Sequence, residues 1–168
     1  MSQRKLFFYW GLYTFIALLL LLCQAFLLPH LRLWHIHPFL PPCIAAVTAV
    51  YTSRRGGVIF GFFLGFLCDM LFTGVFPCFY LLVFSLCAFG AGLLSHRFIS
   101  PGLLCSLLVG TLSLFVTELL QLFFLSFGGD VSFLAVIRLL FIEIVITVPF
   151  LFVLHPLYSR VNRFLANV

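Results

Sequence analysis

The ionisable side chains that fall inside apolar segments are the residues of this chain most able to do chemistry. Three of the four carboxylates, Asp69, Glu118 and Glu143, stand in such segments. A lone charge at membrane depth costs about 2.5 to 3.5 kcal/mol on insertion scales, so opposite charges should meet. We therefore expect a polar cluster of Asp69, Glu118, Gln121 and Arg138, in which Arg138 compensates Asp69 or Glu118. Glu143 has no obvious partner in the sequence.

Such a cluster can stabilise the fold, line a ligand pocket or carry protons, and the residues leave these alternatives open. A proton transporter should also show an inverted internal repeat, which we do not find. Nothing indicates an enzyme, because the phosphate-binding, zinc-protease, serine-hydrolase and dinucleotide motifs are missing from the sequence. Asp69 is the only aspartate in an apolar segment, and the serines there have no histidine beside them in sequence. We predict no enzymatic activity and no cofactor.

Six apolar segments must position these residues, and they make up almost the whole chain. Of the 168 residues, 64% are hydrophobic and 8% are charged, whereas a soluble domain carries about 25% charged residues. A membrane span needs about 20 apolar residues, so the second segment, which begins at three prolines, is short and is expected to start as a non-helical stretch. We predict one all-α domain over residues 1–168, a polytopic membrane bundle of about six transmembrane helices. Five spans and a re-entrant segment are the alternative. The segments are 6–28, 38–52, 57–73, 77–94, 102–127 and 133–154.

The cationic residues predict the orientation of this bundle. If six spans are counted, only Arg32 lies in a loop on the outer side, and seven cationic residues fall on the other: Arg4, Lys5, Arg54, Arg55, Arg97, Arg160 and Arg163. Because cationic loops stay in the cytoplasm, both chain ends are predicted to be cytoplasmic. The first segment is then a retained signal anchor, since it lacks a small-x-small cleavage site. The basic charge indicates topology and lipid headgroups, and we expect no binding to nucleic acid.

A stripe of glycines precedes Asp69 at helical spacing. Gly57, Gly61 and Gly65 recur every four residues, so they share one face of a helix with the carboxylate. Glycines in this arrangement let two membrane helices approach closely. The stripe is therefore either an internal packing face or a groove that binds the helix of a partner protein, and the sequence leaves both open.

The remaining candidate residues are the cysteines and a loop that connects the first two segments. On the outer side the loop carries Trp34, His35 and His37, without a carboxylate or cysteine to complete a metal site. We expect this loop to be an interfacial anchor or a partner-facing surface, and we predict no metal. The six cysteines form no C-x-x-C pair and are expected to be small buried hydrophobic residues.

Residues 57–94 resemble the signature region of the MreD family of rod shape-determining proteins, and the rest of the chain resembles that family more loosely. The likeness rests on spaced glycines, an aspartate before a glycine-containing turn, and an aromatic-rich segment closing on small residues: Gly61, Gly65, Asp69, Gly74 and the Gly90–Gly92 pair. Cys78 departs from the pattern, because the family often has glycine after the turn.

The resemblance implies a non-enzymatic, multi-pass subunit of the bacterial inner membrane that takes part in cell-wall elongation and cell shape. It implies binding to MreC, a single-span protein, and an indirect link to the RodA–transpeptidase peptidoglycan synthase and to MreB. It also implies a fold similar to the substrate-binding subunits of energy-coupling-factor vitamin transporters. Such a transporter subunit is the alternative function, although Ala17 and Ala25 are eight residues apart and the Ala-x-x-x-Ala motif of those subunits is missing.

Overall fold

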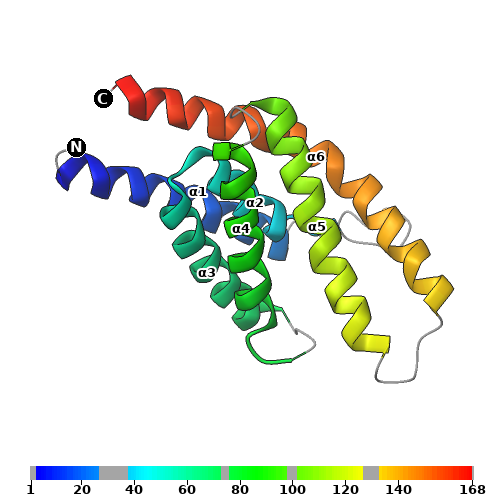
Figure 1. Ribbon diagram of the computed structural model, residues 1–168. Coiled ribbons are helices and arrows are strands. Elements are labelled where there is room, and N and C mark those ends of the chain that lie inside the picture. The colour runs from blue at the N-terminus through cyan, green and yellow to red at the C-terminus, as the bar shows by residue number, and fades with distance from the viewer. Residues whose placement is uncertain (1–2, 27–37, 73–75, 98–101, 127–132, 168) are drawn as a thin grey trace.

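The computed structural model describes residues 3–26, 38–72, 76–97, 102–126 and 133–167 (Figure 1). All regular structure in these ranges is helical, which confirms the all-α prediction. The helices match the six predicted segments in order: α1 (Gln3–Phe26), α2 (Pro41–Tyr51), α3 (Arg54–Leu71), α4 (Phe79–Arg97), α5 (Leu103–Ser126) and α6 (Phe133–Asn167). Two stretches, Leu103–Leu125 and Leu140–Asn162, are long and apolar enough to cross a membrane.

Helix α2 is the centre of the bundle. Residues 41–50 are all buried, and α3, α4, α5 and α6 pack around them. Pro41 and Pro42 occupy the first turn, where a missing N–H costs nothing, and the preceding residues 38–40 are non-helical as predicted. The 11 residues of α2 span about 16 Å, roughly half of a membrane's hydrocarbon thickness. This helix alone is therefore too short to be a span.

Helices α3 and α4 form an antiparallel hairpin beside α2. Helix α3 begins after Ser53, whose side-chain oxygen accepts a hydrogen bond from the Gly56 N–H at 3.3 Å. At the start of α3, Arg54 lies with its guanidinium 4.5 Å from the ring centroid of Phe89 on α4. At the other end of the hairpin, the last turn of α3, which includes Asp69, packs against the start of α4.

Helices α5 and α6 pair in an antiparallel register. Gly110 lies against Leu151, and one end of the pair is marked by a contact between Ser106 and His155. Helix α6 continues to Asn167, beyond the predicted limit at residue 154 and through Pro149 and Pro156. The helix persists because its later turns bury a stripe against the core: Leu151, Leu154 and Tyr158.

Helix α1 covers one side of the bundle through a single buried stripe. Its buried residues are Tyr13, Ala17, Leu21 and Gln24. The Gln24 side-chain amide donates to the Pro38 carbonyl at 2.7 Å, and its oxygen accepts from the Leu40 N–H at 3.2 Å. The end of α1 is therefore fixed to the entry of α2, and the two helices run antiparallel.

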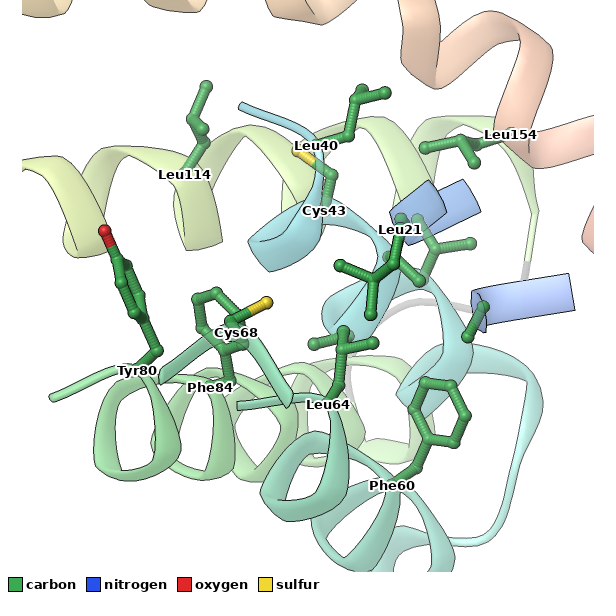
Figure 2. Close-up of a cluster of buried hydrophobic side chains, with 14 of the residues drawn as sticks. Leu21, Leu40, Cys43, Phe60, Leu64, Cys68, Tyr80, Phe84, Leu114 and Leu154 are labelled. Carbon is green, nitrogen blue, oxygen red and sulfur yellow. The ribbon is translucent and has the colours of Figure 1, made fainter. Parts of the chain in front are cut away.

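The hydrophobic core draws on all six helices. Figure 2 shows it with ten residues labelled: Leu21, Leu40, Cys43, Phe60, Leu64, Cys68, Tyr80, Phe84, Leu114 and Leu154. In Figure 1 the start of α1 and the end of α6 lie on the same side of the molecule. The Trp10 ring on α1 packs on Gly56 on α3, so the start of α3 lies near the first half of α1. We call this the arginine end; it includes Arg54, Arg55 and Arg160.

Candidate functional site

Asp69 lies near the end of α3 and caps the start of α4. Its two carboxylate oxygens accept hydrogen bonds from the backbone N–H groups of Tyr80 and Leu81, each at 3.0 Å. These residues are the second and third of α4, whose first N–H groups have no partner within the helix. The partial positive charge of a helix N-terminus also favours a carboxylate at this position. The hairpin α3–α4 is therefore joined by a charge-assisted cap.

The predicted compensation of Asp69 or Glu118 by Arg138 is wrong. Both oxygens of Asp69 are used by α4, and the Arg138 side chain is exposed on α6. Within the described residues, neither carboxylate forms an ion pair with Arg138. The physical reason is that a helix N-terminus supplies the compensating charge for Asp69, so no arginine is needed.

The structure brings together part of the predicted polar cluster and adds two residues to it. Tyr80 interacts electrostatically with Asp69, Glu118 and Glu143. Glu143 on α6 also interacts electrostatically with Glu118 on α5, and the Glu118 residue is 9% exposed. Gln121 is half-buried one turn further along α5. We call this group the acidic cluster; it contains carboxylates from three helices and a tyrosine, but not Arg138.

The glycine stripe of α3 is filled by helices of the same chain. A Cβ added to Gly57 would lie 2.7 Å from the Ala49 Cβ on α2, and one added to Gly61 would lie 2.8 Å from the Phe84 carbonyl oxygen on α4. At Gly65 the added atom would lie 2.5 Å from the Leu81 Cα. Of the two alternatives left open by the sequence, the structure has internal packing. The prediction of a partner groove at these three glycines needs correction.

A different surface, with buried small residues at its base and exposed leucines at its edges, is open to the surroundings. Between α4 and α5 there is a groove with a volume of about 160 Å³, lined mostly by apolar and small residues, among them Cys87, Gly90, Ala91, Val109, Leu112 and Ser113. A Cβ added to Gly90 would have no atom within 4 Å. Leu86 and Leu112, at the edges of this groove, are 64% and 50% exposed. We call this surface the α4–α5 groove.

Sequence reasoning missed a polar contact that joins three helices. The His155 Nδ1 lies 2.8 Å from both the Tyr51 hydroxyl and the Ser106 hydroxyl, so α2, α5 and α6 meet there. Ser106 is 12 residues, or about 18 Å of helix, from Glu118, so this contact is far from the acidic cluster. The three residues are distant in sequence, and only the register of α5 against α6 brings them together. Ser106 on α5 and His155 on α6 are 49 residues apart, and no sequence pattern predicts that they meet.

The remaining predicted residues are those of the loop between the first two segments and the cysteines. Trp34, His35 and His37 lie outside the described residues, so the role predicted for that loop stays a prediction. All six cysteines are free thiols; Cys43, Cys68 and Cys105 are buried, as expected of small hydrophobic residues. Cys78 is exposed, which corrects the expectation for that residue, and its φ of 67° is in the left-handed region that favours glycine.

We expect Cys78→Gly to stabilise the protein. A left-handed conformation costs a residue with a Cβ roughly 1 kcal/mol more than glycine, and the exposed thiol loses no packing when it is removed. The free energy of unfolding should therefore rise by about 1 kcal/mol in an SDS titration followed by circular dichroism. Cys78→Ala is the matched control, since it removes the thiol but keeps the Cβ. Equal stability of the two variants would contradict the argument.

Comparisons of the chain with protein-family models, with curated proteins and with solved structures gave no match. The geometry described above therefore defines the class of the protein only as an all-α bundle with membrane-length apolar helices.

Proposed function

We propose that this protein is a non-enzymatic, multi-pass subunit of the bacterial inner membrane that binds an MreC-like single-span protein in the cell-wall elongation complex. Through that partner it would act on the RodA–transpeptidase synthase and connect to MreB. The observation that carries the proposal is the α4–α5 groove, because it is an open groove with small residues at its base on a bundle that consists almost entirely of helices.

The exposed surface supports a membrane location. Large apolar side chains are exposed on every helix but α2, which is buried, and several are more than 60% exposed: Phe15, Phe63, Met70, Leu86, Leu104, Phe141 and Val153. Soluble monomers seldom expose contiguous apolar patches of large size. The arginine end, with Arg54, Arg55 and Arg160 near both chain ends, is consistent with both termini in the cytoplasm. In this topology the second segment returns the chain to the arginine end, although its helix α2 is shorter than a full span.

The groove supports a helix as the bound partner. Association of helices in lipid depends on close van der Waals packing, and small residues allow the backbones to approach. Gly90 leaves open space on α4, and the buried Ala91 on α4 and Ser113 on α5 form the base of the groove. The Ser113 hydroxyl already donates to the Pro42 carbonyl at 2.8 Å, so a partner helix would leave no hydroxyl there unpaired. Gly90 also belongs to the segment that resembles the MreD family.

We expect Gly90→Leu to reduce co-purification of the MreC-like protein at least tenfold. The leucine side chain would occupy the space that the partner's helix needs, and tenfold corresponds to about 1.4 kcal/mol of binding free energy. The measurement is affinity purification of the tagged chain after co-expression with the MreC-like protein encoded in the same genome, in mild detergent, followed by quantitative mass spectrometry.

Gly11→Leu is the matched control, because Gly11 is on α1 and an added Cβ there also has no atom within 4 Å. This variant should recover as much partner as the unmodified chain. If neither the unmodified chain nor the Gly11→Leu variant recovers the MreC-like protein, the proposed function is wrong. Recovery of an ATPase with a coupling subunit, or of a tightly bound vitamin, would favour the transporter subunit and make the acidic cluster a candidate pocket.

A further inference from the structure

A second apolar groove lies between α1 and α3. Its volume is about 380 Å³, within the range of about 300–1,000 Å³ that is typical of small-molecule sites. The α1 wall includes Trp10, Thr14 and Ala17, and the α3 wall includes Ile59, Phe63 and Leu67. The Thr14 hydroxyl donates to the Trp10 carbonyl at 2.8 Å, so it offers no free donor to the groove. The site is therefore suited to a hydrocarbon chain.

The dimensions of this groove match one leaflet of a membrane. Ile59 and Leu67 are eight residues apart on α3, which is about 12 Å, and one leaflet has a hydrocarbon depth of about 15 Å. Ile59 and Phe63 are 54% and 62% exposed, so the groove opens laterally, where an acyl chain could enter from the bilayer.

One end of the groove is cationic. Arg55, Ile59, Phe63 and Leu67 recur every four residues, so Arg55 extends the α3 wall of the groove by one turn. Its side chain is exposed, whereas that of the neighbouring Arg54 lies over Phe89. The Trp10 ring packs on Gly56 beside this arginine, and tryptophan prefers the headgroup level of a membrane. A basic site between helices on the cytoplasmic side is typical of binding to anionic lipid headgroups.

We propose that the α1–α3 groove binds one anionic phospholipid of the cytoplasmic leaflet. An acyl chain lies between the two walls, and the phosphate lies at Arg55 next to Trp10. The charge of Arg55 selects the anionic headgroup, and the apolar walls hold the chain without regard to the headgroup. This site requires insertion in a membrane, as the proposed function does, but it does not require the MreC-like partner.

Trp10 provides the test, because it lines the groove and the chain has only two tryptophans. The protein with Trp34→Phe is reconstituted in phosphatidylcholine vesicles that contain a fixed fraction of phosphatidylglycerol. Bromine quenches tryptophan fluorescence on contact, so the brominated lipid is either the phosphatidylglycerol or an equal amount of the phosphatidylcholine. We expect brominated phosphatidylglycerol to quench Trp10 about fivefold more effectively, the factor that corresponds to about 1 kcal/mol for one arginine at an anionic surface.

Three variants separate this site from general attraction to anionic lipid. Arg55→Gln should remove the preference, whereas Arg160→Gln, at another exposed arginine of the same end, should preserve it. Thr14→Phe changes an exposed residue of the groove and should reduce quenching by both lipids. Equal quenching by the two lipids in the unmodified groove, or a preference that survives Arg55→Gln, would overturn the proposal. Neither result bears on binding of the partner protein.

Discussion

Gly65→Ala should destabilise the protein by about 3 kcal/mol, the largest effect that we expect from adding a single methyl group. The added Cβ would lie 2.5 Å from both the Leu81 Cα and the Tyr80 carbonyl oxygen, and backbone atoms cannot rotate away as a side chain can. Overpacking of a tight core typically costs about 1–3 kcal/mol. The measurement is the free energy of unfolding in an SDS titration, followed by circular dichroism.

The other glycines of the hairpin supply graded controls. At Gly61 the nearest atom is the Phe84 carbonyl oxygen at 2.8 Å, at Gly92 the nearest contact is an ordinary 3.5 Å, and at Gly90 there is none within 4 Å. The stability of the alanine variants should therefore increase in the order 65, 61, 92 and 90, and Gly90→Ala should be as stable as the unmodified chain or slightly more stable. Equal effects at Gly65 and Gly90 would contradict the close packing of α3 on α4.

Asp69→Ala should also destabilise the protein by about 3 kcal/mol. It removes two hydrogen bonds to a carboxylate, each worth about 1.5–3 kcal/mol, and their effects are not fully additive. Asp69→Asn keeps one acceptor oxygen but replaces the other with a donor, so about half of the loss is expected. Amide hydrogen exchange at Tyr80 and Leu81 should accelerate in both variants, because the start of α4 frays. Unchanged protection of these two amides would contradict the capping role.

A double-mutant cycle tests whether Asp69 acts through α4 or through Arg138. Because Arg138 is exposed and Asp69 bonds to α4, Asp69→Asn and Arg138→Leu should have additive effects, to within about 0.5 kcal/mol. A coupling energy above about 1 kcal/mol would restore the ion pair that the sequence suggested and the structure lacks.

Much of the fold could be predicted from the sequence because prolines, glycines and charges separate the apolar runs. The extra turns of α6 could not be predicted in this way, since Pro156 and the polar residues after it indicate an end. The signal that would have extended the helix is the spacing of Leu151, Leu154 and Tyr158, which follows one helical face. The short α2 was foreseen from its prolines and length, but its central, fully buried position depends on the packing of four other helices.

The candidate site was harder to predict, because its partners are backbone groups or residues distant in sequence. Pairing by charge assigned Arg138 to Asp69 or Glu118, although the N–H groups of α4 offer Asp69 a closer positive end. Spacing alone cannot distinguish a glycine stripe that packs inside the chain from one that awaits a partner. Gly65 and Gly90 have equal conformational freedom as residues, and only the neighbouring helix makes one indispensable and leaves the other open.

Site-specific photocrosslinking most directly tests the claim that the α4–α5 groove binds a partner's helix. Benzoylphenylalanine would replace Leu112 at the edge of this groove or, as the control, Phe152 on α6, which is exposed to a similar extent at 54%. We predict that illumination of membranes containing the MreC-like protein joins it to the chain from position 112 and not from position 152. Crosslinks from position 152 alone, or from neither position while the two proteins still co-purify, would contradict the account.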